Sequence, residues 1–220
     1  MQRIFVRIMQ SIDYILFPKK CLVCKKTKES LCKNCSSTLP QPERDLPKYI
    51  WALYEYRHPV IKKVLTDAKY RKRFEPLYSF GAVLSDAATD IVSEYVELHN
   101  YTNIFIIPVP ISKKRMHERG FNQALILAKA LVHNNTSNFG ILNTAVIKKI
   151  DKTPQASIHN RQDRLKSPIG TFEMTKDEKV LRKLQGSFCI IIDDITTTGA
   201  TISEVRPHRK KKSAKKPHRP

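Results

Sequence analysis

The sequence contains no apolar run of the roughly 18 residues that a membrane-spanning helix requires. The opening segment Met1–Pro18 is rich in apolar residues, but Arg7, Gln10 and Asp13 interrupt it, and no small-residue cleavage site follows. It therefore lacks the pattern of a signal peptide. We expect a soluble, cytoplasmic protein, and in that reducing compartment clustered cysteines bind metal more often than they form disulfides.

Acidic residues are also scarce, because 20 Asp and Glu stand against 40 Lys and Arg, for a formal net charge of +20. Such an excess favours anionic partners, namely nucleic acid, phosphorylated metabolites or an acidic membrane surface. The motif G-x-x-x-x-G-K-[ST] is absent, which argues against a P-loop nucleotide hydrolase.

The apolar residues between Ile4 and Leu16 have helical spacing and predict an amphipathic helix that packs on the next module. Leu39–Pro47 contains three prolines in nine residues and predicts a linker with a domain boundary. We expect a first domain over residues 1–45, a second over residues 46–205, and a disordered basic tail over residues 206–220.

The second domain alternates strand-like and helix-like patterns. The expected strands are Tyr49–Arg57, with its aromatic side chains in the core, Asn103–Val109, Ala145–Ile150 and Phe188–Ile192. The expected helices run from Pro59 to Pro76, over Leu77–Leu98, and onward from Asn122 after a basic loop. Continuous apolar strands separated by helices favour the α/β class, with a parallel sheet covered on both faces.

Four of the five cysteines form two C-x-x-C pairs, Cys21 with Cys24 and Cys32 with Cys35. Two such turns can direct four thiolates at one ion, so we expect a structural zinc site, with an iron–sulfur cluster or disulfides as alternatives. Cys189 lies inside an apolar strand and is expected to be a core residue. The lysines around the cysteine pairs suit nucleic acid phosphates and equally suit a solvated surface.

The segment FCIIIDDITTTGAT, Phe188–Thr201, places Asp193 and Asp194 directly after an apolar strand. At the carboxyl end of a strand in an open α/β sheet, these carboxylates can accept hydrogen bonds from the vicinal hydroxyls of a ribose. The following threonines offer hydroxyls and backbone N–H groups to a phosphate, and Gly199 permits close approach of the backbone. An acidic pair that binds magnesium beside a nucleotide is the alternative.

IIIDDITTTGAT resembles the phosphoribosyl pyrophosphate (PRPP) signature of type I phosphoribosyltransferases. Pro108–Leu131 (PVPISKKRMHERGFNQALILAKAL) and Gln155–Phe172 (QASIHNRQDRLKSPIGTF) are similar to hallmark segments of the ComF family. With the paired cysteines, the resemblance covers about residues 18–205. It implies a phosphoribosyltransferase-like domain behind a zinc module, and a role in DNA uptake and natural transformation.

The resemblance also implies roles for particular residues. Asp193 and Asp194 would hold the ribose, and Arg164, in a mobile loop with Arg161, would join them at the catalytic centre. The 5′-phosphate would bind at Thr196, Thr197, Thr198, Gly199, Ala200 and Thr201, and the pyrophosphate, with magnesium, at a loop containing Lys113, Lys114 and Arg115. The family signature comprises Arg119, Gly120, Phe121, Asn122, Gln123 and Gln155, of which Asn122 also suits a helix N-cap.

Three functions remain open at this point. The first is a competence protein that binds PRPP, leaning towards a transferase in which a nucleophile displaces pyrophosphate from the anomeric carbon. The second is a metabolic phosphoribosyltransferase with an unidentified acceptor. The third is a non-catalytic module that binds single-stranded DNA through its zinc turns and basic surface. Other DNA-uptake proteins are further expected partners.

The segment from Arg206 to Pro220 holds eight Lys or Arg and no acid, and Pro207 cannot sit inside a helix that begins near Gly199. A phosphoribosyltransferase would continue here with a complete helix and a further strand. A reading-frame shift near Val205 is the favoured explanation, ahead of a natural DNA-binding tail and an artificial terminus.

Overall fold

The computed structural model describes residues 20–26, 29–43, 45–99, 101, 103–135, 139–148 and 170–206. Three expectations lie outside these ranges. They are the first helix at Ile4–Leu16, the loop residues Gln155, Arg161 and Arg164, and the basic tail after Arg206.

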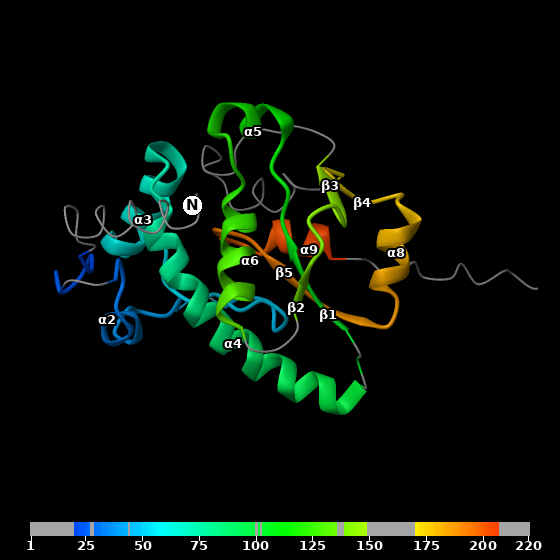
Figure 1. Cartoon of the computed structure of the whole chain (residues 1–220), viewed down its shortest axis with the longest axis horizontal. Coiled ribbons are helices and arrows are strands. Elements are labelled where there is room, and N and C mark those ends of the chain that lie inside the picture. Colours follow the sequence, from blue (N-terminus) through cyan, green and yellow to red (C-terminus); the bar gives the residue numbers. More distant parts are fainter. Residues whose placement is uncertain are drawn as a thin grey trace, which may run out of the picture.

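A three-stranded parallel sheet forms the centre of the α/β domain (Figure 1). Its strands are β2 (Phe139–Ile141), β1 (Asn103–Pro108) and β5 (Ser187–Ile192), in the order β2-β1-β5. The sheet confirms the α/β class and the strands predicted at Asn103–Val109 and Phe188–Ile192. The sequence pattern missed β2, because it is only three residues long and contains Gly140, against which the ring of Phe105 packs.

The expected strand Ala145–Ile150 forms in part, as β3 (Val146–Lys148), but it does not join the parallel sheet. It pairs antiparallel with β4 (Phe172–Met174) in a separate two-stranded sheet. Only residues 142–145 connect β2 to β3, whereas a parallel neighbour requires a crossover of about a dozen residues or more. The short turn therefore excludes the expected placement.

The described residues include three long helices, α3 (Pro59–Arg71), α4 (Glu75–His99) and α6 (Gln123–Asn134). Helix α6 packs on the strands of the sheet, α4 packs on α6, and α3 packs on α4 (Figure 1). Helix α4 crosses α6 so closely that a Cβ atom on Gly81 would lie 2.4 Å from the Cβ of Ala130. The prediction that Pro76 ends the preceding helix is wrong. Lys72, in the left-handed conformation (φ 55°), ends α3, and Pro76 lies in the first turn of α4, where a missing N–H costs nothing.

The remaining helices are short: α2 (Lys33–Ser37), α5 (Lys113–Arg119), α8 (Glu178–Leu184) and α9 (Ala200–Val205). Helix α5 corrects the expectation of a basic loop after β1. Ser112 caps it, because its side chain accepts a hydrogen bond from the backbone N–H of Arg115 (3.2 Å).

The expected strand Tyr49–Arg57 is wrong, because this segment consists of turns and irregular backbone. Its aromatic residues favour a strand, but β-propensity stabilises a strand only when a neighbouring edge pairs with it. The core placement also fails for most of them, since the side chain of Trp51 is 59% exposed and Tyr49 and Tyr56 are exposed as well. Tyr54 alone of the four packs inward, against Phe80.

One hydrophobic cluster joins the cysteine segment to the α/β elements. Cys21, Leu31 and Leu39 belong to the same buried cluster as residues of α3, α4, α6 and the sheet. A second cluster lies around β3, β4 and α9. The division into two domains stays a prediction. Among the described residues, no helix is long and apolar enough to cross a membrane.

Candidate functional site

Strand β5 carries Asp193 and Asp194 to the edge of the sheet. Its final residue, Ile192, is buried, and its carbonyl oxygen accepts a hydrogen bond from the backbone N–H of Val109 (2.8 Å) just beyond β1. The carboxyl ends of the two neighbouring strands are therefore fixed together. The acidic pair follows at the position where open α/β sheets bind ligands.

The two carboxylates have different partners. Oδ2 of Asp194 lies 2.6 Å from Nζ of Lys69 on α3, and Oδ1 of Asp193 accepts a hydrogen bond from the backbone N–H of Asp194 (2.9 Å). Burial, followed by the negative charge of Asp194, raises the pKa of Asp193 to about 8, against the opposing effect of Lys69. Near neutral pH Asp193 therefore keeps its proton.

The sequence pattern does not single out Lys69. Lys69 directly follows the apolar residues of the predicted helix and belongs to none of the motifs. It precedes Asp194 by 125 positions along the chain. Only the packing of α3 beside the end of β5 brings the two charges together.

A threonine-rich turn connects the acidic pair to α9. The hydroxyl of Thr196 accepts a hydrogen bond from the backbone N–H of Gly199 (3.2 Å), and that of Thr198 accepts one from Ala200 (3.4 Å). The hydroxyl of Thr197 is buried and has no hydrogen-bond partner among the described residues. The turn thus combines ordered threonines with one uncommitted hydroxyl, which suits an oxygen-rich ligand. Thr201 lies half-buried on α9.

Gly199 adopts the left-handed conformation (φ 75°) at the start of α9. A Cβ atom here would also lie 2.6 Å from Cδ1 of Ile50. The neighbouring Tyr49 hydroxyl lies 2.8 Å from the hydroxyl of Ser203 on α9. The segment around Ile50 therefore supports the threonine turn from outside the sheet, a contact that the sequence did not indicate.

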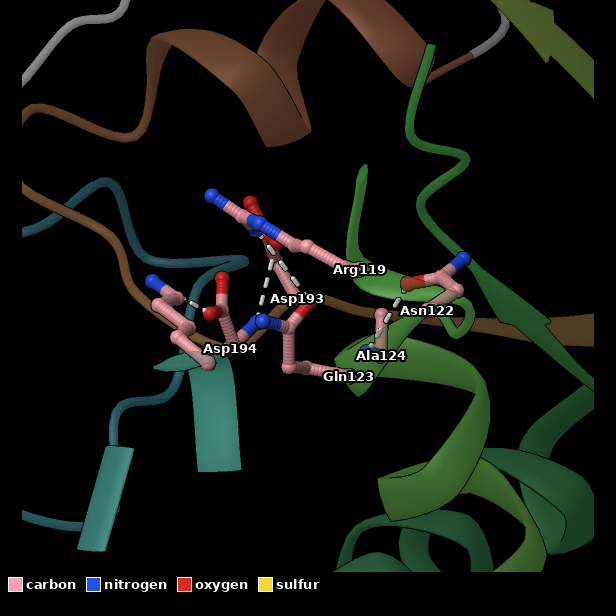
Figure 2. Close-up of polar contacts among 7 residues, drawn as sticks. Arg119, Asn122, Gln123, Ala124, Asp193 and Asp194 are labelled. Carbon is pink, nitrogen blue, oxygen red and sulfur yellow. Dashed lines mark hydrogen bonds and ion pairs between the residues drawn. The ribbon is translucent and has the colours of Figure 1, made fainter. Parts of the chain in front are cut away.

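The residues of the signature Arg119–Gln123 have distinct environments, and Figure 2 shows those of Arg119, Asn122 and Gln123. Gly120 ends α5 in the left-handed conformation, and the ring of Phe121 packs edge-on against Phe74 at 4.4 Å between centroids. Asn122 is the N-cap of α6, as predicted, because its Oδ1 accepts from the backbone N–H of Ala124 (3.0 Å). These three residues build the junction between α5 and α6.

Asn122 also anchors α6 to the sheet. Its Nδ2 donates to the carbonyl oxygen of Val109 (2.9 Å), the residue whose N–H is bonded to Ile192. The first turn of α6 is thereby held beside the acidic pair. Gln123, in this turn, is only 2% exposed, and Nη1 of Arg119 lies 3.5 Å from its Oε1.

The three cations that the resemblance assigned to pyrophosphate lie in the first turn of α5. Lys113 and Lys114 are exposed, and Arg115 is half-buried. Helix α5 follows the end of β1 closely and begins at the same edge of the sheet as the acidic pair (Figure 1). Their backbone is helical, and their binding of pyrophosphate stays a prediction.

The four paired cysteines converge on one point. The sulfur atoms of Cys21, Cys24, Cys32 and Cys35 all lie within 4.8 Å of one another. The sulfur atoms of Cys24 and Cys32, one from each C-x-x-C pair, are 3.8 Å apart. This is about the distance between two thiolate sulfurs in a tetrahedral zinc site. All five cysteines are free thiols, so the disulfide alternative does not apply in this structure. The cluster could hold a metal ion.

The electrostatics of the cluster fit a site for a cation. Burial acts to raise the pKa of Cys21, but backbone hydrogen bonds, first from Cys32 and then from Cys24, outweigh it and lower the pKa to about 6. The pKa of Cys35 is raised to about 12, mainly by the neighbouring thiols, first that of Cys32, and by burial. A second thiolate is costly beside the first, and a divalent cation would remove this repulsion. Cys189 lies apart, half-buried in β5.

Comparison with curated proteins finds a related chain, the competence protein ComFC of Bacillus subtilis (strain 168), which is 30% identical over 151 residues. The match covers 69% of the present chain and 53% of the relative. The chain belongs to the ComF family. It spans about half the length of this ComF relative, and no family model matches it.

The described structure covers only part of the expected ComF site. Gln155, Arg161 and Arg164 lie outside the described residues, so the predicted closure over the acidic pair stays a prediction. The acidic pair, the threonine turn and the first turn of α6 do converge at one edge of the sheet.

Proposed function

We propose that this protein binds PRPP in a phosphoribosyltransferase-like domain and acts in DNA uptake during competence. The placement of Asp193 and Asp194 at the carboxyl end of β5, ahead of the threonine turn, carries this proposal. The similarity to a competence protein supports the biological role.

Different residues of the site bind different parts of PRPP. The acidic pair accepts hydrogen bonds from the ribose diol, with the carboxyl group of Asp194 held in place by its ion pair with Lys69. The turn Thr196–Thr201 binds the 5′-phosphate through hydroxyl and backbone N–H groups at the start of α9. Lys113, Lys114 and Arg115 neutralise the pyrophosphate. Magnesium supplies additional neutralisation of phosphate charge when PRPP is bound.

In the enzymatic form of this proposal, an acceptor attacks the anomeric carbon and pyrophosphate leaves with the bonding electrons. The acceptor is unidentified. A protein that binds PRPP without turnover would use the same arrangement of residues. Arg164 would enter from the loop that precedes β4 and exclude water from the reacting centre.

Isothermal titration calorimetry with PRPP and magnesium tests the proposal directly. We expect wild-type protein to bind with a stoichiometry of one. The double variant Asp193→Asn with Asp194→Asn should lose binding by at least about 100-fold, because both carboxyl groups that contact the diol are replaced. Asp177→Asn changes an exposed carboxylate on α8 and is the matched control. A folded wild-type protein that does not bind PRPP rejects the proposal.

A second function, binding of single-stranded DNA, is favoured by the exposed aromatic side chains. Trp51 is 59% exposed and Tyr70 is 75% exposed on a chain of net charge +20. Exposed rings can stack on bases while lysines contact phosphates. Retardation of a labelled oligonucleotide should weaken steeply as the salt concentration rises. The Trp51→Ala variant should retard the oligonucleotide less than wild-type protein does. Salt-independent retardation would contradict this function.

We also propose that the metal in the four-cysteine cluster is zinc, with a structural role. Four sulfur ligands in a closed set suit zinc and leave no coordination position for a substrate. The ion would join Cys21, in the hydrophobic cluster of α3 and α4, to Cys24, which is exposed.

A further inference from the structure

Gln123 presents an unusual combination of burial and unmet hydrogen bonding. The side chain is 2% exposed, yet its Nε2 has no hydrogen-bond partner among the residues that the structure describes. A buried amide nitrogen normally finds an acceptor, because its desolvation is otherwise uncompensated. The position therefore calls for a functional reason.

Arg119 fixes which end of the amide is unsatisfied. Its Nη1 lies 3.5 Å from Oε1 of Gln123, and a guanidinium can only donate, so the facing atom of Gln123 must be the oxygen. The two N–H groups of Nε2 consequently point away from Arg119. Figure 2 shows the side chain directed from the first turn of α6 toward Asp193 and Asp194.

Hydrogen bonds hold the first turn of α6 near the end of β5. Asn122 bonds to the carbonyl of Val109, and the N–H of Val109 bonds to Ile192, the residue before Asp193. Gln123 and Asp193 thus each adjoin one end of the same short chain of hydrogen bonds. Their relative position is set by the sheet and by the N-cap of α6, and not by a surface loop.

A diol bound between two carboxylates needs hydrogen-bond donors as well as acceptors. Each hydroxyl has one proton to donate and two lone pairs that accept, whereas a carboxylate in its charged form only accepts. Lys69 is committed to Asp194 in the described structure. Nε2 of Gln123 is a further buried donor beside the pair, and it is unpaired among the described residues.

We propose that Gln123 is a ligand-contacting residue that donates from Nε2 to a hydroxyl oxygen of the bound ribose diol, and that Arg119 positions its amide. This inference rests on the proposed PRPP site and deepens it. The site would select phosphorylated sugars that carry both ring hydroxyls over those that lack them. An apolar contact could not achieve this, because rejecting a missing hydroxyl requires a buried polar group that is left unpaired.

The test compares ribose 5-phosphate with its 2,3-dideoxy analogue by calorimetry on the full chain. Wild-type protein should prefer ribose 5-phosphate by at least about 100-fold. In Gln123→Met, which keeps the length of the side chain, affinity for ribose 5-phosphate should fall about tenfold while that for the dideoxy analogue is unchanged. Gln185→Met, at an exposed position after α8, is the matched control.

Gln123→Glu provides a second variant if the apolar one is poorly folded. Its added charge weakens both phosphorylated ligands alike, so the ratio of the two affinities is compared. A ratio that stays at the wild-type value in both variants overturns the inference, as does an equal loss for both ligands in Gln123→Met. Wild-type protein that binds neither PRPP nor ribose 5-phosphate removes the proposed function, and the inference with it.

Discussion

Lys69 on α3 and Asp194 at the end of β5 form an ion pair whose Nζ and Oδ2 atoms lie 2.6 Å apart. Both side chains are largely buried, at 18% and 17% exposure. The pair connects a helix near the cysteine segment to the acidic site of the sheet. Lys69 also opposes the rise in the pKa of Asp193.

Removal of this cation should destabilise the protein. We expect Lys69→Met to lower the free energy of unfolding by about 1–3 kcal/mol in urea, because the largely buried carboxyl group of Asp194 loses its ion-pair partner. Lys63→Met breaks an ion pair with Asp67 on the same helix, but Lys63 is 54% exposed, so its cost should stay below about 0.5 kcal/mol. Equal costs for the two variants would show that the Asp194 pair is no stronger than a surface pair.

The raised pKa of Asp193 predicts a specific pH dependence. The folded state keeps a proton on Asp193 up to about pH 8, whereas the unfolded chain releases it near its ordinary value of 3.8. The folded state therefore binds more protons between these values, and its stability falls as pH rises through this window. Asp193→Asn removes this loss, and its stability relative to wild type should grow by at least about 1 kcal/mol from pH 5 to pH 9.

Urea unfolding at several pH values measures this difference. Asp177→Asn, which alters an exposed carboxylate that caps α8, is the matched control, and its difference from wild type should be the same at every pH tested. A difference for Asp193→Asn that shrinks towards pH 9 would contradict the assignment of the proton to Asp193.

Gly199 should tolerate no side chain. Gly199→Ala combines the left-handed φ of 75° with a Cβ atom 2.6 Å from Cδ1 of Ile50, and we expect a loss of about 2–4 kcal/mol in unfolding free energy. Gly186 has a similar φ of 67° with nothing within 4 Å, so Gly186→Ala should lose only about 1–2 kcal/mol.

A second substitution separates strain from contact at this position. Ile50→Val deletes Cδ1, the atom that the new methyl group would meet, and should recover part of the stability lost in Gly199→Ala. Thermal unfolding of the single and double variants gives the coupling between the two positions. Strictly additive losses would show that backbone strain alone disfavours alanine.

The parts of the structure that local sequence predicts are those decided by local forces. The apolar runs ending at Pro108 and Ile192 give β1 and β5, and Asn122 caps α6, because burial and capping act within a few residues. In a parallel sheet, the carboxyl ends of both strands lie at the same edge. The sequence alone is therefore sufficient to predict that the acidic pair lies at this edge.

What local sequence could not predict depends on packing between distant segments. Lys69 meets Asp194, and Ile50 meets Gly199, across more than 100 residues in each case. The expected strand Tyr49–Arg57 failed for the same reason, since aromatic residues favour a strand only where an edge is available for pairing. The unpaired amide of Gln123 likewise becomes visible only when its neighbours are known.

The four-cysteine cluster leads to the last prediction, which concerns metal removal. We expect one zinc ion per chain by atomic absorption, and Cys24→Ser should lose most of it, because one of four sulfur ligands is replaced by a weaker hydroxyl. Cys189→Ser, in β5 away from the cluster, should retain full zinc content. A strong chelator should lower the melting temperature of wild type but leave Cys24→Ser nearly unchanged, because ion binding stabilises only the folded state. Folded wild-type protein without metal would mean that Leu31 and Leu39 suffice to hold this segment on α3 and α4.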